Sequence, residues 1–312
     1  MTGSGKSRAT GRSPAAGFTA AAAGGHNGAP RGDRPFVVGR RRVPADLPAR
    51  SRTVPSPPMK VELLPSSLPP SDAQFLVSFL VDGEVAIDAG AVGLLSDLRR
   101  QERVRHVFIT HEHVDHVASL PILLENVYQP GPDCVELLAS ADVLEFLHRD
   151  VFNGRVWPDF FALSTGEDRF VHGTPLEPGV PVVRAGKTFT ALPVSHGCPT
   201  LGLLVDDGRV AVAFPSDTGP TDAYWEHVAA CERLRAVFLE ASFPNARADL
   251  ARTTGHHCPA TFAAEVRRLP RDVRVIVVHR KARYAAEIAR EIAALGLPNV
   301  ELVRPGHVYE FA

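Results

Sequence analysis

Three histidines and an aspartate lie within six residues near the middle of the chain: His111, His113, Asp115 and His116. Imidazole nitrogen is a good ligand for zinc and related first-row ions, and a carboxylate extends the choice to manganese or iron. Residues two apart in an extended chain project to the same side, so we expect His111 and His113 to point the same way. A cluster this dense predicts a metal site, because packing alone does not explain it.

Three further candidates follow short apolar runs. His196 comes after residues 190–195, Asp217 after 210–214, and His279 after 275–278. Each stands where a strand would finish, so three more strand ends could bring ligands to the same place. Taken singly, each of these residues could equally have a purely structural role and bind no metal. Together with the first cluster they are numerous enough to hold two ions that share one carboxylate.

Short strands and helices would have to position these residues. Asp88 ends a strand expected at Val85–Ile87, and we interpret it as a residue that orients ligands, with a turn-forming role as the alternative. Further strands are expected at 75–80, 104–110, 135–138, 188–193, 201–205, 210–214, 236–240 and 273–279, and helices at 93–103, 120–128, 141–149, 222–231, 259–269 and 283–295. Strands in both halves with helices between them favour two sheets packed face to face, with helices outside, as one domain.

Charge is unevenly distributed, although the net charge is only −1. Residues 1–58 hold ten of the 34 Lys and Arg and two of the 35 Asp and Glu, which leaves 24 basic and 33 acidic residues in 59–312. The first segment is rich in Gly, Ala, Pro, Ser and Arg, so we expect a disordered basic tail over 1–58 and a folded domain over 59–312. Met59 is a candidate for the true start. The acidic domain argues against stable nucleic-acid binding.

The chain has four cysteines, which are widely spaced and form no C-x-x-C pair. This pattern favours reduced thiols over a disulfide framework or a cysteine-based structural zinc site. No apolar stretch approaches the roughly 18–20 residues that span a membrane. We therefore expect a cytoplasmic protein without membrane contacts. A homodimer is an open alternative.

The pattern H-x-H-x-D-H, followed by single His, Asp and His residues, resembles the metallo-β-lactamase superfamily. More narrowly, residues 151–160, 239–245, 255–259 and 278–281 are similar to class II 3′,5′-cyclic-nucleotide phosphodiesterases. The resemblance covers roughly residues 60–312. It implies an α/β metallo-β-lactamase fold, which is a four-layer αββα sandwich of two mixed β-sheets with outer helices.

The resemblance also implies a binuclear phosphodiesterase with two divalent ions, most simply Zn²⁺, with Mn²⁺ or Fe²⁺ as alternatives. One ion would be held by His111, His113 and His196, and the other by Asp115, His116 and His279, with Asp217 bridging. A metal-bridged hydroxide would convert a cyclic nucleotide, cAMP or cGMP, to the nucleoside 5′-monophosphate.

Catalytic roles implied by the resemblance fall on Asp115, Glu240 and His256. Glu240 would orient His256, which protonates the leaving oxygen. The neighbouring His257 is an alternative proton donor. Substrate contacts are expected from Asn153, Trp157 and Lys281, although an aromatic residue is more often part of a core.

Two other enzyme classes share this resemblance. A tRNA 3′-processing endonuclease shares the metal cluster and the glutamate–histidine pair, but it needs an electropositive RNA-binding surface, which the acidic domain does not favour. A lactone or thioester hydrolase does not require the pair formed by Glu240 and His256. A metal-binding regulator is the non-enzymatic alternative.

Overall fold

The computed structural model describes residues 57–67 and 70–312. The first of its two sheets has the strand order β14-β1-β2-β3-β4-β5-β6. Its strands are β1 (Met59–Leu63), β2 (Phe79–Val81), β3 (Val85–Ile87), β4 (His106–Phe108), β5 (Val135–Ala139), β6 (Val171–Pro175) and β14 (Val308–Phe311). Antiparallel pairing of β1 with β2 gives way to parallel pairing from β3 to β6, so the sheet is mixed.

The second sheet has the order β13-β12-β11-β10-β9-β8-β7 and is also mixed. Its strands are β7 (Pro181–Arg184), β8 (Lys187–Pro193), β9 (Leu201–Asp206), β10 (Ala211–Phe214), β11 (Leu234–Glu240), β12 (Arg274–Val278) and β13 (Val300–Leu302). The parallel strands β11 and β12 are almost continuously apolar and buried, because both of their faces are covered. Their carboxyl ends lead directly into Glu240 and His279.

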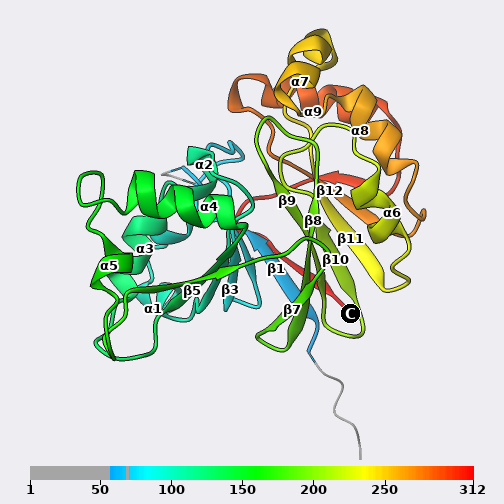
Figure 1. Cartoon of the computed structure of the whole chain (residues 1–312). Helices are drawn as coiled ribbons and strands as arrows, with labels where there is room; N and C mark the ends of the chain where they lie inside the picture. Colours follow the sequence, from blue (N-terminus) through cyan, green and yellow to red (C-terminus); the bar gives the residue numbers. More distant parts are fainter. Residues whose placement is uncertain (1–56, 68–69) are drawn as a thin grey trace, which may run out of the picture. The chain divides into compact units, whose positions relative to one another are not determined.

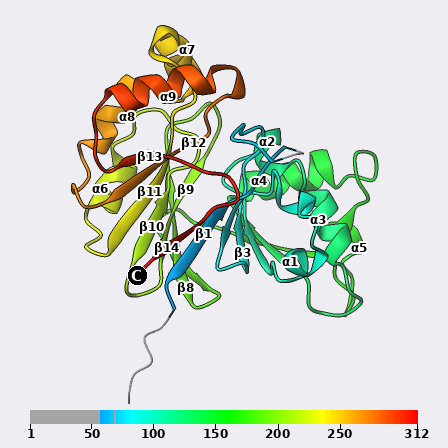
Figure 2. The ribbon, with the colours of Figure 1, turned by 180° about the vertical axis from the view of Figure 1, so that it is seen from behind.

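Helices cover the outer side of each sheet (Figures 1 and 2). Those beside the first sheet are α1 (Leu98–Glu102), α2 (Val114–Val117), α3 (Leu120–Val127), α4 (Ala141–Phe146) and α5 (Phe160–Leu163). Those beside the second are α6 (Ala223–Ala229), α7 (Ala248–Thr254), α8 (Pro259–Val266) and α9 (Ala285–Ala294).

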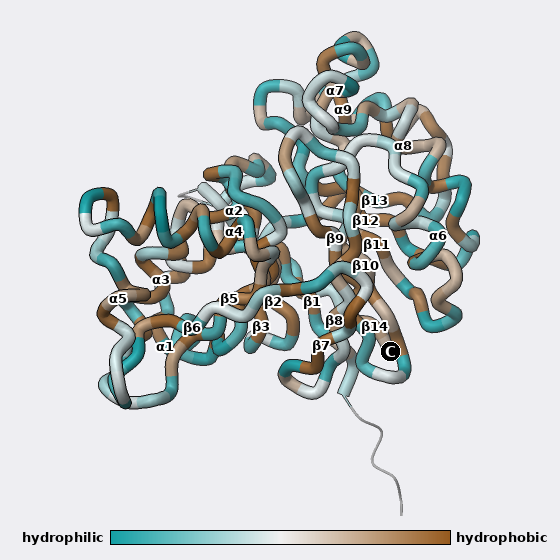
Figure 3. Tube along the Cα trace, viewed as in Figure 1, coloured by the Kyte–Doolittle hydropathy of each residue, from teal (hydrophilic) through white to brown (hydrophobic). Residues whose placement is uncertain are grey.

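Three separate apolar layers hold these elements together, and Figure 3 shows hydrophobic segments in both sheets. Between the sheets, Phe79 packs against Phe214 and Phe238 with ring centroids 5.2 Å apart. A second layer joins the first sheet to its helices, and a third, containing the fully buried Trp225, joins the second sheet to α6, α8 and α9. Three apolar interfaces separate four layers, so the expected αββα sandwich is confirmed.

Several expected elements were wrong in extent, and two of them differ most. The helix expected at 93–103 is split into a 3₁₀ turn and α1, because Asp97 accepts a hydrogen bond from the Arg99 amide at 3.1 Å and starts a new helix. The strand expected at 75–80 begins only at Phe79. The backbone of Val77 instead bonds the carbonyl of Asp115 and the amide of Gly90, so this segment supports the histidine loop.

Two other expectations concern the chain's surroundings. Within the part of the chain that the structure describes, no helix is both long and apolar enough to cross a membrane. The expected basic tail falls almost wholly outside the described residues, which include only its last two, 57 and 58.

An ion-pair network ties the two sheets together at Glu136 of β5. Its carboxylate accepts two hydrogen bonds of 2.6 Å from Arg184 of β7 and one from Thr174 of β6, and it contacts His106 of β4 at 2.9 Å. The Arg184 guanidinium outweighs the effect of burial and holds the pKa of Glu136 at about 2. We therefore expect this carboxylate to stabilise the contact between the sheets.

Replacing Glu136 with glutamine is expected to lower the free energy of unfolding by about 1–3 kcal/mol at neutral pH, because hydrogen bonds to a charged group are lost. A depressed carboxyl pKa stabilises the fold above the ordinary value of 4.5, and that stabilisation is lost as pH falls toward about 2. The free energies of unfolding of wild type and variant, measured with denaturant, should therefore become equal as pH falls through this window. The exposed pair of Glu301 and Arg274 offers a control, since E301Q should cost less than about 1 kcal/mol at any pH. A constant E136Q deficit down to pH 3 would contradict the assignment.

Candidate metal centre

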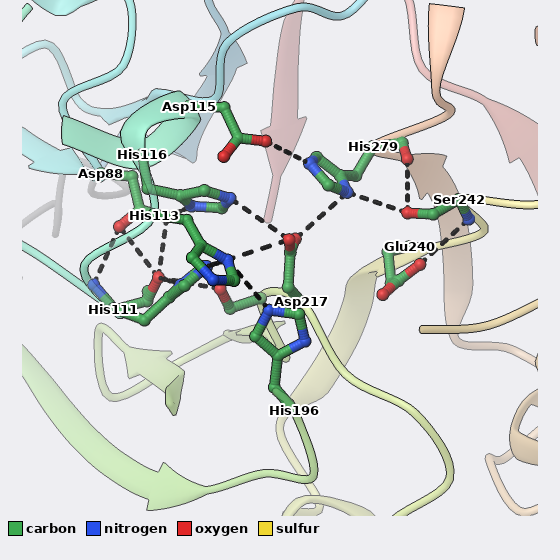
Figure 4. A network of polar contacts seen from close by, with 12 residues as sticks. Asp88, His111, His113, Asp115, His116, His196, Asp217, Glu240, Ser242 and His279 are labelled. Atoms are coloured by element: carbon green, nitrogen blue, oxygen red, sulfur yellow. Dashed lines mark hydrogen bonds and ion pairs between the residues drawn. The ribbon is translucent and has the colours of Figure 1, made fainter. Parts of the chain in front are cut away.

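Loops at the ends of four strands bring the candidate ligands together (Figure 4). The loop after β4 and the short helix α2 supply four of them, and the loops after β8, β10 and β12 supply one each. The set that converges is His111, His113, Asp115, His116, His196, Asp217 and His279. The structure thus brings together residues up to 168 positions apart, from His111 to His279.

Three imidazole nitrogens meet at one side of this cluster. Nε2 of His111 lies 3.1 Å from Nδ1 of His113, which lies 3.2 Å from Nε2 of His196. Burial, reinforced by the nearby His116, lowers the pKa of His111. A neutral imidazole has a free nitrogen lone pair, so this trio is suited to hold a cation.

The other side of the cluster is richer in carboxylate. Nε2 of His279 lies 3.1 Å from Asp115, and Nδ1 of His279 lies 3.2 Å from Oδ1 of Asp217. Oδ2 of Asp217 lies 3.5 Å from Nε2 of His116 and 3.9 Å from Nε2 of His111. Asp217 therefore reaches both sides, which is the position that a bridging ligand needs.

The residues present fit a bound cation. Nδ1 of His116 lies 2.7 Å from Oδ2 of Asp88, whereas its Nε2 is buried without a hydrogen-bond partner. Such orphaned polar atoms are rare in folded proteins and need a cause. Although burial opposes the charge of Asp217, His279 and His116 hold its pKa far below the ordinary value. A cluster that stabilises a buried carboxylate and leaves a nitrogen unpaired suits divalent metal ions.

Asp88 fixes the orientation of His116. Its Oδ1 accepts a 2.8 Å hydrogen bond from the Thr110 amide, and the Thr110 hydroxyl lies 3.0 Å from both carboxylate oxygens. Asp88, Ser216 and His279 are also three of the five described non-glycine residues with positive φ. Backbone strain of this kind is maintained where the site requires it.

We expect D88A to weaken metal affinity by about 10- to 100-fold, because partners that orient a ligating histidine contribute that much. Competition with a coloured chelator would measure the affinity. The exposed Asp272 provides a control, and D272A should bind metal as wild type does. An unchanged affinity in D88A would show that His116 is oriented by other contacts.

His196 owes its position to a glycine at the end of α7. Its Nδ1 donates a 2.9 Å hydrogen bond to the Gly255 carbonyl, which leaves Nε2 to face the other imidazoles. Gly255 has a φ of 66° and ends α7 in the left-handed conformation. A Cβ atom there would lie 2.7 Å from the Cα of His196, so both the turn and the close approach require glycine.

Two residues that support His279 were not predicted from the sequence. The Ser242 hydroxyl donates to the carbonyl of His279 at 2.8 Å and lies 2.9 Å from its Nδ1. The His279 amide donates to Oε1 of Gln74 at 2.5 Å. Ser242 lies two residues after Glu240, in a segment that had already been singled out, whereas Gln74 carries no recognisable signal.

Glu240 and His256 form a buried pair beside the cluster. Oε1 of Glu240 lies 2.6 Å from Nδ1 of His256 and accepts from the Thr218 amide, while Oε2 accepts from the Ser242 and His257 amides. Burial opposes a charged imidazole, but the Glu240 carboxylate outweighs it and raises the pKa of His256. The His256 ring centroid lies 4.9 Å from that of His196 and 5.7 Å from that of His279. An imidazole whose raised pKa favours the protonated form thus lies at the edge of the cluster.

The remaining candidates are placed differently. Nζ of Lys281 lies 3.6 Å from Asp115, so it borders the cluster. The Asn153 side chain bonds the backbone of residues 149, 155 and 156, and Trp157 packs against the apolar layer beside the first sheet. Substrate contacts by Asn153 and Trp157 stay predictions. His257 is fully buried, and burial lowers its pKa to about 4, which makes it a poor proton donor.

Comparison with known proteins defines the class. A model of the beta-lactamase superfamily domain matches residues 85–280, so the chain belongs to the metallo-β-lactamase superfamily. Within it, the chain resembles 3′,5′-cyclic-nucleotide phosphodiesterases. It is 28% identical over 184 residues to a probable enzyme of this name from Yersinia pestis, and 28% identical over 182 residues to one from Aliivibrio fischeri. These alignments cover 54% and 53% of this chain and about half of each relative, 52% and 53%.

Solved structures share the fold. Unliganded yeast PDE1 aligns with a TM-score of 0.66 and 16% identity, covering 82% of this chain and all of that one. The short form of human tRNase Z aligns with a TM-score of 0.59 and 19% identity, covering 81% and 100%. Because phosphodiesterase and tRNase share this architecture, the fold alone does not select a substrate.

Proposed function

We propose that the protein is a binuclear phosphodiesterase that hydrolyses a 3′,5′-cyclic nucleotide to the nucleoside 5′-monophosphate. The single observation that carries this proposal is the buried pair of Glu240 and His256 at the edge of a seven-residue ligand cluster. The curated relatives named as cyclic-nucleotide phosphodiesterases support it. Two divalent ions, with Zn²⁺ as the first choice, supply Lewis-acid activation of water and neutralise phosphate charge.

The chain's own groups have separate tasks. His111, His113 and His196 would hold one ion, Asp115, His116 and His279 would hold the other, and Asp217 would be shared. The Lys281 ammonium, which is partly exposed beside Asp115, is suited to contact a phosphate oxygen. Glu240 holds Nδ1 of His256, so the opposite nitrogen can donate its proton to the departing ribose oxygen. An alkoxide is a poor leaving group, so cleavage depends on this proton.

A substrate panel tests the proposal. Zinc- and manganese-loaded protein would be assayed with cAMP, cGMP, bis-p-nitrophenyl phosphate, precursor tRNA, a homoserine lactone and a β-lactam. We expect metal-dependent conversion of a cyclic nucleotide to the 5′-monophosphate and not to the 3′-isomer. Turnover of precursor tRNA or of a lactone, with neither cyclic nucleotide cleaved, would assign the site to another substrate class.

Three wider expectations are part of the proposal. We place the protein in the cytoplasm, with its four cysteines reduced. Residues 1–58 act as a basic tail to a hydrolase domain formed by 59–312. The acidic balance of that domain favours a small substrate over stable nucleic-acid binding.

A further inference from the structure

A thiol lies beside the three-histidine side of the cluster. Cys198 follows His196 by two residues, and its Sγ lies 3.8 Å from Nε2 of His113. His111, His113, His196 and Cys198 each offer a ligand atom, and all of these atoms lie within 4.8 Å of one another. Nothing in the proposed reaction uses this thiol.

We propose that Cys198 is a further protein ligand of the three-histidine site, in addition to the shared Asp217, and makes it select Zn²⁺ over Mn²⁺. The inference rests on the proposed metal centre but not on the identity of the substrate. Thiolate is a soft ligand that favours zinc, whereas manganese favours oxygen ligands. On binding, the sulfur–metal bond forms, the S–H bond breaks, and the proton passes to solvent.

Two contacts of the Cys198 sulfur are long. It lies 3.8 Å from Nε2 of His113 and 3.8 Å from the Thr200 hydroxyl, where contacts are weak, and it also interacts with the Glu112 carboxylate. Cys198 is partly exposed and is preceded by Gly197. With the shared Asp217, the three imidazoles and the thiolate make five protein donors, and the thiolate is the soft donor that distinguishes zinc from manganese.

The other cysteines lack this setting. Cys258 is buried at the start of α8, where its sulfur lies 3.7 Å from the Thr261 hydroxyl. Cys134 and Cys231 are partly buried, and neither is near enough to a described group of ligand-type residues to complete a metal site. Cys231, at the end of α6, therefore provides a matched control.

Cobalt substitution tests the inference by spectroscopy. Full-length wild type, C198S and C231S would be titrated with Co²⁺, which takes zinc sites and reports sulfur ligation through a near-ultraviolet charge-transfer band. We expect the band in wild type and C231S and its loss in C198S, while the visible bands of bound Co²⁺ remain in all three. Visible bands without the sulfur band in wild type would overturn the role of Cys198 and leave the metal centre in place. If wild type bound no Co²⁺ at all, both the proposed metal centre and the role of Cys198 would be contradicted.

Selectivity provides a second readout. Chelator competition should show that C198S weakens Zn²⁺ binding by about tenfold or more, because a contact to the metal site is lost. The same substitution should change Mn²⁺ binding by less than about threefold. Alkylation of the wild-type protein, followed by peptide mass analysis, should show Cys198 protected by Zn²⁺ and unprotected by Mn²⁺. Equal losses for both ions, or labelling that Zn²⁺ does not slow, would contradict the proposed selectivity.

Discussion

Exchange of Asp217 for asparagine will lower kcat/KM toward a cyclic nucleotide by on the order of a thousandfold, because several kcal/mol of charge stabilisation by the second ion are lost. Asp217 is almost fully buried and is the only described carboxylate that lies within 3.9 Å of His111, His116 and His279 together. Asparagine preserves the shape but removes the negative charge that two cations share. Elemental analysis of the purified variant should accordingly find fewer than two ions per chain.

D272N is the matched control for this experiment, since Asp272 is exposed and lies outside the cluster. It should keep wild-type activity and metal content. If D217N retained both ions and near-normal turnover, Asp217 would not be a shared ligand, and the two halves of the cluster would have to be held by other groups.

Replacement of His256 with alanine will reduce cyclic-nucleotide turnover by about 10²- to 10⁴-fold, the usual contribution of general acid catalysis. The same variant should cleave bis-p-nitrophenyl phosphate almost as well as wild type, because p-nitrophenolate leaves without a proton. The ratio of the two rates isolates proton donation from metal binding. Metal content should be unchanged, because His256 is not among the seven proposed ligands.

The control for the histidine is H227Q, since His227 is exposed on α6. It should leave both rates unaltered. An equal loss of both rates in H256A would mean that His256 maintains the site's structure or its metals, and the role of the Glu240 pair in protonating the ribose oxygen would have to be given up.

Much of the site's architecture follows from sequence periodicity. Apolar runs ended by His279, Asp217 or His196 indicate strand ends, and the parallel pairing of β10, β11 and β12 places the ends before Asp217 and His279 at one edge. The strands β11 and β12 were expected at 236–240 and 273–279 and lie at Leu234–Glu240 and Arg274–Val278. Their unbroken apolar character is enough to identify buried strands, although a sequence does not state their order in the sheet.

Other features depend on contacts that no local pattern encodes. Gln74 reaches His279 across 205 residues, and Val77 bonds the backbone of Asp115, so the segment before β2 serves the site and not the sheet. The close approach of Gly93 is another such contact, since a Cβ there would lie 2.3 Å from the Ser119 carbonyl. Asn153, whose substrate contact stays a prediction, accepts hydrogen bonds from the amides of residues 155 and 156 in a local turn.

Anomalous diffraction at the zinc absorption edge, from crystals of the zinc-loaded chain, tests the central claim most directly. Two peaks should be found about 3.5–4 Å apart. One should lie about 2.0–2.1 Å from nitrogens of His111, His113 and His196, and the other at that distance from nitrogens of His116 and His279. A single peak, or zinc bound away from these side chains, would contradict the claim that the converging loops form a site for two metal ions.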